Sequence, residues 1–140
     1  MERLVVATVL VAIAVVAAAV IGRRRPDPPA QPRWAVPAQL DRADFARPDA
    51  PWLVAVFTSA TCRSCSDAVR AAAPLASAQV GVDEVEVGAR PHVHRRYGVE
   101  AVPTVVVADS EGAVRASFVG CPPAAELWTA VAGLREPGSS

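Results

Sequence analysis

The sequence predicts an α/β domain, a central mixed sheet with helices on both faces, preceded by a single N-terminal transmembrane helix. Three observations predict this arrangement. An apolar run from Leu4 to Gly22 opens the chain, Cys62 and Cys65 follow a short apolar segment, and strand-like and helix-like segments alternate after residue 51. Alternation of this kind is typical of a sheet that helices cover on both sides.

The composition limits the classes of partner. Fourteen arginines, with no lysine, balance 14 acidic residues, so the formal net charge is zero. A neutral chain implies no polyelectrolyte partner, and with 5% aromatic residues nothing resembles a nucleic-acid surface. Three cysteines are too few for a domain that disulfides hold together.

The apolar run is predicted to be a membrane anchor. Thr8 is its only polar side chain, and a helix of this length measures about 28 Å, close to the hydrocarbon thickness of a bilayer. The alternative is a cleaved signal peptide, for which Ala17-Ala18-Ala19 offers small residues. The nearly neutral start Met1-Glu2-Arg3 and the cluster Arg23-Arg24-Arg25 favour an uncleaved anchor.

The same arginines predict the orientation in the cell membrane. Three positive charges follow the span, against one arginine and the α-amino group before it. The positive-inside rule then puts the domain of this single-pass protein in the cytoplasm, with an extracytoplasmic domain as the alternative. The side matters because a cytoplasmic domain meets a reducing thiol pool.

Four parts are predicted along the chain. They are a transmembrane anchor (1–22), a Pro/Arg-rich linker (23–33), a folded domain (34–136) and a tail (137–140). The proline content of the linker predicts a semi-rigid spacer.

Each element of the domain has a local signal. Apolar Leu40 and Phe45 predict a short helix over Gln39–Phe45, and the mostly apolar run Trp52–Thr58 predicts a buried strand. An Ala-rich helix is expected over Cys62–Ser77. The remaining elements are a strand marked by Val82, Val85 and Val87, a helix over Pro91–Tyr97, a strand over Thr104–Ala108, a turn at Asp109–Gly112, a strand over Ala113–Val119 and a helix over Ala124–Leu134.

The segment Cys62-Arg63-Ser64-Cys65 contains the two candidate reactive residues, Cys62 and Cys65. Two thiols that share a helix start favour thiol–disulfide exchange, because a thiolate is stabilised there. The alternatives are two packed small hydrophobes, or a zinc site of about four ligands. Only Cys121, His92 and His94 could complete such a site. The two histidines, at spacing two on a helix, are expected to be surface residues that point to different faces.

Three motifs together resemble the thioredoxin family, over about residues 34–136. They are Cys62-x-x-Cys65 after an apolar strand, Val102-Pro103-Thr104 before a β-branched strand, and Phe118-Val119-Gly120 before the last helix. More narrowly, the chain is similar to small membrane-anchored thioredoxin-like proteins of high-GC bacteria. The resemblance implies a thioredoxin-like fold.

The resemblance also implies roles for individual residues. Cys62 is the nucleophile, with Arg63 beside it lowering its pKa, and Cys65, one turn into the helix, is the resolving thiol. Pro103 is a cis proline, and the backbone of Val102 pairs with an extended substrate. No cofactor and no metal are implied; the partners are protein disulfides or thiols and an unidentified electron donor.

Several positions depart from the family pattern. Thr61, counted with the substrate-binding residues, replaces the usual tryptophan, and Arg63-Ser64 replaces Gly-Pro. Val56 stands where the family has a buried acid that assists proton transfer, and Arg70 where it has a helix-kinking proline. These changes bear on the redox potential, the rate of resolution and recognition by a reductase.

Cys121 is an additional thiol directly after Gly120. The resemblance puts it on the rim of the site, where it forms an alternative disulfide or transient adduct with Cys62, or is a spectator thiol. The sequence thus favours a membrane-tethered thiol–disulfide oxidoreductase that reduces protein disulfides. The alternatives are a copper or zinc carrier and a non-catalytic binding module.

Overall fold

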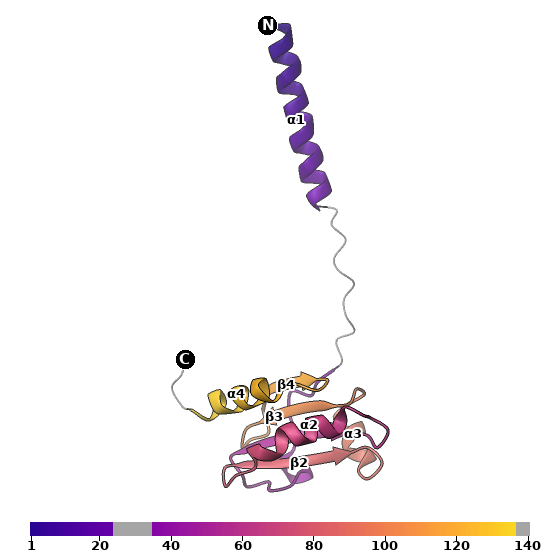
Figure 1. Cartoon of the computed structure of the whole chain (residues 1–140), viewed down its shortest axis with the longest axis vertical. Coiled ribbons are helices and arrows are strands. Elements are labelled where there is room, and N and C mark those ends of the chain that lie inside the picture. The colour runs from indigo at the N-terminus through magenta and orange to yellow at the C-terminus, as the bar shows by residue number, and fades with distance from the viewer. Residues whose placement is uncertain (24–34, 137–140) are drawn as a thin grey trace. The chain divides into compact units, whose positions relative to one another are not determined.

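The computed structural model describes residues 1–23 and 35–136 (Figure 1). Most of the predicted linker and the whole tail lie outside this range. The chain divides into two units, Met1–Arg33 and Trp34–Ser140.

Helix α1 (Glu2–Arg23) is long and apolar enough, over Glu2–Val20, to cross a membrane. Between Leu4 and Val20 the one polar side chain is Thr8, whose hydroxyl donates to the carbonyl oxygens of Leu4 and Val5, at 3.1 and 2.9 Å. The hydroxyl is therefore satisfied inside the helix, as a bilayer requires of a polar group.

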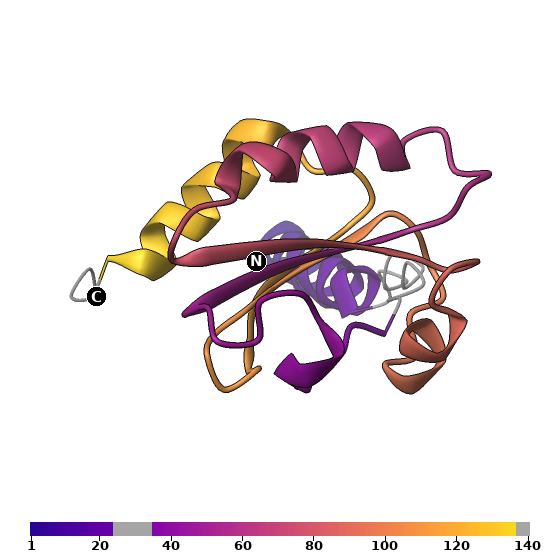
Figure 2. The ribbon, with the colours of Figure 1, turned by 90° about the horizontal axis from the view of Figure 1, so that it is seen from below.

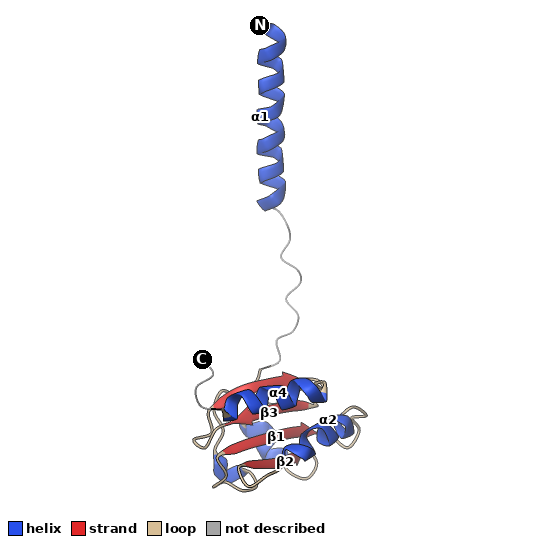
Figure 3. Cartoon of the chain, turned by 60° about the vertical axis from the view of Figure 1, so that its left-hand side comes forward, coloured by secondary structure: helices blue, strands red, loops and turns tan. Residues whose placement is uncertain are grey.

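The domain contains the predicted succession of strands and helices (Figure 3). Its elements are η1 (Arg42–Asp44), β1 (Trp52–Thr58), α2 (Cys65–Ala72), η2 (Ala73–Leu75), β2 (Val80–Glu86), α3 (Pro91–Arg96), β3 (Thr104–Ala108), β4 (Val114–Val119) and α4 (Ala124–Arg135), where η marks a 3₁₀ turn.

The four strands form one mixed sheet in the order β2-β1-β3-β4. β1 is parallel to β2 and antiparallel to β3, and β4 is antiparallel to β3. Helices α2 and α4 cover one face, and α3 and η1 the other (Figure 2). This is the predicted fold class.

The apolar run of β1 is explained by the layers on both sides of it. Side chains of a strand alternate between faces. Val54 and Val56 pack with the α2–α4 side, and Leu53, Ala55 and Phe57 pack with the α3–η1 side. The sequence of a strand that is buried on both faces is a nearly continuous apolar run.

The predicted helix over Gln39–Phe45 is wrong. Only η1 is helical, and Gln39 instead forms an antiparallel bridge with Ala113 at the β3–β4 hairpin. The amide of Leu40 donates to the carbonyl of Gly112 at 2.8 Å. Backbone pairing with the hairpin therefore overrides the apolar spacing that predicted a helix.

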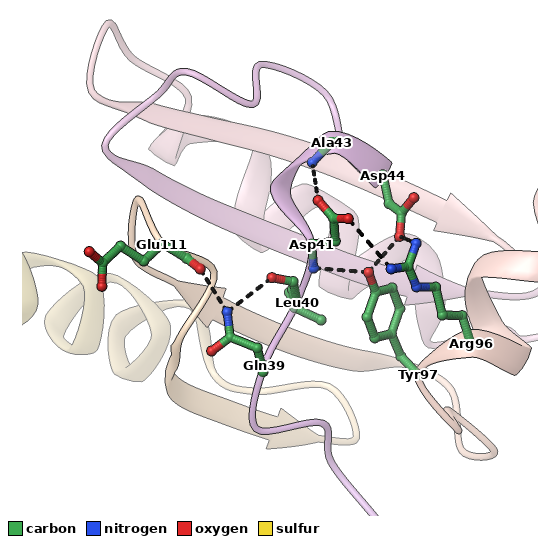
Figure 4. A network of polar contacts seen from close by, with 8 residues as sticks. All are labelled: Gln39, Leu40, Asp41, Ala43, Asp44, Arg96, Tyr97 and Glu111. Atoms are coloured by element: carbon green, nitrogen blue, oxygen red, sulfur yellow. Dashed lines mark hydrogen bonds and ion pairs between the residues drawn. The ribbon is translucent and has the colours of Figure 1, made fainter.

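A polar network fastens η1 to the end of α3 (Figure 4). The Tyr97 hydroxyl accepts a hydrogen bond from the amide of Asp41 at 2.9 Å and donates one to the Asp44 carboxylate. Arg96 donates to the same carboxylate at 2.8 Å. Burial, and then the bond to Asp44, raise the pKa of Tyr97 above its ordinary value.

Candidate functional site

Three chain segments meet at one end of the sheet. The register pairs Phe57 at the end of β1 with Thr104 at the start of β3, and Thr104 with Val119 at the end of β4. The site residues predicted from the sequence, which all lie just beyond these strand ends, are Thr61, Cys62, Arg63, Cys65, Val102, Pro103 and Cys121. The topology therefore brings the three motifs to a common edge.

Cys62 and Cys65 form a disulfide, with Cα atoms 5.4 Å apart. Their environments differ: Cys62 is half-buried, whereas Cys65 is 3% exposed. Cys62 is therefore the more accessible cysteine of the pair.

Helix α2 starts at Cys65, three residues later than the sequence predicted, so Cys65 lies in its first turn and not one turn in. Local hydrogen bonds hold the preceding loop out of the helix. The amide of Cys62 donates to the carbonyl of Ser59 at 3.2 Å, and the amide of Thr61 donates to the Ser59 hydroxyl at 3.3 Å. Serine side chains compete with helical bonding in this way.

Two hydroxyls next to the disulfide were missed by the sequence reasoning. Oγ of Ser59 lies 3.0 Å from Oγ1 of Thr61, and Oγ of Ser64 lies 3.7 Å from Sγ of Cys62. The four serines and threonines between positions 59 and 66 were the available signal. Arg63 is exposed and makes no ion pair among the described residues.

The Val102–Pro103 peptide bond is cis, as the family resemblance led us to expect, and Pro103 is buried. The carbonyl of Pro103 accepts a hydrogen bond of 2.8 Å from the amide of Gly120. Across residues 35–136, the backbone of Val102 makes no hydrogen bond. Neither its N–H nor its C=O is therefore engaged within these residues.

Cys121 is exposed and outside any disulfide. Its Sγ lies 3.8 Å from the carbonyl oxygen of Pro122, its neighbour in sequence. Since Gly120 is bonded to Pro103, Cys121 stands at the same end of the sheet as the cysteine pair.

No acid stands beneath the cysteine pair on β1, where Val56 is buried. The ladder partner of Val56 on β2 is Glu84, whose carboxylate accepts a hydrogen bond of 3.0 Å from the buried Thr58 hydroxyl. A carboxylate is thus present on the neighbouring strand. The sequence contains Glu84, but it does not reveal that Glu84 lies beside Val56 and Thr58 in the sheet.

Glu86 organises the loop after β2. Its carboxylate accepts hydrogen bonds from the amides of Gly88, at 2.9 Å, and Ala89, at 2.8 Å. These bonds, with a smaller contribution from the amide of Ala60, lower the pKa of Glu86. The Glu86 carboxylate therefore fixes the start of the loop after β2.

His94 is buried, contrary to the surface position predicted for it. It is 5% exposed, its Nε2 lies 2.8 Å from the carbonyl oxygen of Val85, and its ring meets the Phe57 ring edge-on at 5.2 Å. His92 is exposed. Within the described part of the chain, no three His, Cys, Asp or Glu side chains gather as a metal site would require.

Neither a protein-family model nor a curated protein matches the chain. Solved structures do. The germline-specific thioredoxin Deadhead of Drosophila melanogaster is 26% identical, with a TM-score of 0.54, over 62% of this chain and 84% of its own.

Two further thioredoxins match in fold. A mutant thioredoxin of Halobacterium salinarum is 23% identical, with a TM-score of 0.55, over 63% of this chain and 78% of its own. Mitochondrial thioredoxin 3 of Saccharomyces cerevisiae, in its oxidized form, is 22% identical, with a TM-score of 0.50, over 59% and 79%. With its sheet, its Cys62–Cys65 disulfide and these neighbours, the chain has a thioredoxin-like fold and the cysteine pair of a thiol–disulfide oxidoreductase.

Proposed function

We propose that the protein is a membrane-tethered reductase of protein disulfides that acts through Cys62 and Cys65. The observation that carries the proposal is the asymmetry of the cysteine pair: a half-buried Cys62 disulfide-bonded to a buried Cys65. The asymmetry supports one sulfur that meets the substrate and one that acts only within the protein.

The reaction is a pair of thiol–disulfide exchanges. The Cys62 thiolate attacks one sulfur of the substrate disulfide, an S–S bond forms between them, and the other substrate sulfur leaves as a thiolate. The Cys65 thiolate then attacks the sulfur of Cys62, which re-forms the Cys62–Cys65 disulfide and releases the second substrate thiolate. Two electrons pass to the substrate, and a separate electron donor must reduce the pair again.

Val102, Pro103 and Thr61 are proposed to bind the substrate. The unengaged N–H and C=O of Val102 support pairing with an extended segment of the substrate, in the manner of an added β-strand. Thr61 adjoins the nucleophile and is exposed, so its small side chain leaves room for a substrate. Arg63 is proposed to favour the Cys62 thiolate by its positive charge.

Insulin reduction by dithiothreitol tests the activity. The full-length chain in detergent should accelerate precipitation of the insulin B chain, and Cys62→Ser should abolish the acceleration. Once it has been reduced and freed of dithiothreitol, Cys65→Ser should instead accumulate a mixed disulfide with insulin through Cys62, since resolution is lost. Equal rates for wild type and Cys62→Ser would contradict the enzyme and favour a binding module.

A cytoplasmic domain is proposed for the tethered protein, because three arginines follow the apolar span. A reducing thiol pool on that side supports the reductase direction. A C-terminal fusion to a reporter that is active on only one side of the membrane tests the orientation. Activity of an exported reporter would overturn the cytoplasmic placement and leave the chemistry of the cysteine pair open.

Cys121 is proposed as an auxiliary thiol that forms an alternative disulfide or transient adduct with Cys62. Its exposure and its position after Gly120 support this role. Non-reduced peptide mapping over a series of glutathione ratios should reveal a Cys62–Cys121 linkage. Detection of Cys62–Cys65 alone at every ratio would make Cys121 a spectator.

A further inference from the structure

Ser64 is the N-cap residue of α2, but it does not act as a cap. Serine is favoured at this position because its hydroxyl normally accepts a hydrogen bond from a backbone amide of the first turn. The Ser64 side chain makes no such bond. Its Oγ lies 3.7 Å from Sγ of Cys62, within hydrogen-bonding distance for sulfur. The hydroxyl is turned away from its helix and toward the sulfur of the nucleophile.

The proton of this hydroxyl gains an acceptor when the pair is reduced. A thiolate accepts hydrogen bonds and has none to donate, whereas a hydroxyl carries one donor. Hydrogen bonds to an ionised acceptor are about twice as strong as those between neutral groups. The contact seen with the disulfide sulfur therefore becomes stronger when Cys62 is a thiolate.

We propose that the Ser64 hydroxyl donates a hydrogen bond to the Cys62 thiolate in the reduced protein and holds this sulfur in its ionised, nucleophilic form. Because it touches the reacting atom, Ser64 is a catalytic residue. The proposal rests on the proposed function only in taking Cys62 as the nucleophile.

The role fits the electron balance of the reaction. When Cys62 attacks a substrate disulfide, its negative charge passes to the departing substrate sulfur, and Ser64 keeps its own proton throughout. Stabilising the thiolate also stabilises the reduced form of the pair relative to the disulfide. Loss of the hydroxyl should therefore make the reduction potential more negative.

Ser66 provides a matched control. It lies two residues further on and is also exposed, but its hydroxyl donates to the carbonyl oxygen of Arg63 at 3.2 Å. Ser66→Ala removes the same atom from the same turn without touching Cys62. Ser64→Ala removes no capping bond, so the helix should be retained, and Ser64→Thr keeps a hydroxyl in place.

The sequence allows each thiol to be followed separately. Trypsin cleaves after arginine here, since lysine is absent, and it does not cleave the Arg47–Pro48 bond. The three cysteines then fall in three tryptic peptides, 43–63 with Cys62, 64–70 with Cys65 and 116–135 with Cys121. Alkylation of Cys62 can be measured without interference from the other two.

The experiment is iodoacetamide alkylation of the reduced full-length chain in detergent, across a pH series, read by mass spectrometry of these peptides. The pH at which the alkylation rate of Cys62 is half-maximal (its midpoint) should rise by about 0.5–1 pH unit in Ser64→Ala, where one unit is a tenfold change in ionisation. Ser66→Ala and Ser64→Thr should keep the wild-type midpoint. The potential of Ser64→Ala against glutathione should be more negative than that of Ser66→Ala.

Equal midpoints in Ser64→Ala and Ser66→Ala would overturn the role of Ser64, whatever the activity in the insulin assay. An inactive wild type in the insulin assay would instead overturn the proposed function. Circular dichroism of each variant shows whether the helix is retained, and a shifted midpoint in Ser64→Ala with an unchanged spectrum supports the hydrogen bond.

Discussion

The amide of Gly120 donates a hydrogen bond of 2.8 Å to the carbonyl of Pro103, which ties the end of β4 to the cis-proline segment. Gly120 holds this position with a φ of 96°, in the left-handed region that favours glycine. Gly120→Ala should therefore lower the free energy of unfolding by about 1–2 kcal/mol. Insulin reduction should slow with it, because the segment proposed to bind the substrate is displaced.

Gly133 gives the control for this substitution. It lies in α4, and an added Cβ would meet no atom within 4 Å. Gly133→Ala should raise the free energy of unfolding, by up to about 1 kcal/mol, since alanine is the better helix former. Urea unfolding followed by tryptophan fluorescence measures both variants. Equal effects of the same sign would contradict the backbone argument at Gly120.

His94 should contribute to stability through its bond to β2. In His94→Leu the carbonyl of Val85 loses the ring nitrogen that lies 2.8 Å from it, and the edge contact with Phe57 is altered. Leaving a buried polar group unpaired costs about 1–3 kcal/mol. His92→Leu, on the exposed side of α3, should stay within about 0.5 kcal/mol of wild type in the same urea assay. A similar loss in both variants would contradict the bond to Val85.

Glu86 should titrate below the ordinary range of a glutamate. The amides of Gly88 and Ala89 bond to its ionised carboxylate and lower its pKa in the folded protein. Its stabilising effect on the loop is therefore present above the ordinary pKa and is lost as the pH falls through the lowered one. The nitrogen and proton chemical shifts of these two amides, followed by NMR from neutral to acidic pH, report that midpoint.

The matched variants for this titration are Glu86→Gln and Glu100→Gln. The first should abolish the acid transition at Gly88 and Ala89, because a neutral amide side chain does not ionise. The second changes an exposed glutamate before Val102 and should leave it in place. A midpoint at or above the ordinary glutamate value would rule out the proposed bonding.

Tyr97 should ionise above the ordinary value of a tyrosine, since burial and the bond to Asp44 raise its pKa. It is the single tyrosine of the chain, so absorbance at the phenolate band reads it directly. A raised pKa means that its contribution to stability is present below the unfolded value and is lost as the pH rises through the folded one. Asp44→Asn should lower the midpoint, and an unchanged midpoint would exclude the bond.

The order of elements could be predicted because each has a local signal. Trp52–Phe57 is apolar throughout, and Pro91 stands in the first turn of α3. The segment 39–45 could not be predicted in the same way. Its conformation depends on pairing with Ala113, more than seventy positions later in the chain, and no local pattern of Leu40 and Phe45 reveals that partner.

The site divides along the same line. The cysteine pair could be predicted from the motif Cys62-x-x-Cys65, and the cis proline from the family resemblance that Val102-Pro103-Thr104 helps to carry. The buried position of His94 depends on the carbonyl of Val85, which lies on another element. The direction of the Ser64 hydroxyl depends on its making no capping hydrogen bond to the first turn of α2. Neither contact can be predicted from the residue types alone, because both are set by the geometry of the backbone.

The pairing of residues 38–40 with the hairpin has a mechanical consequence. Along the described chain, the amide of Leu40 to Gly112 and the amide of Val114 to Ala38 are the first backbone hydrogen bonds that the domain makes. They lie at the hairpin end of β4, whereas Gly120 and the disulfide lie at the other end of the sheet. A force applied through residue 35 is therefore resisted at the hairpin, with the length of a strand between the point of load and the reacting sulfurs.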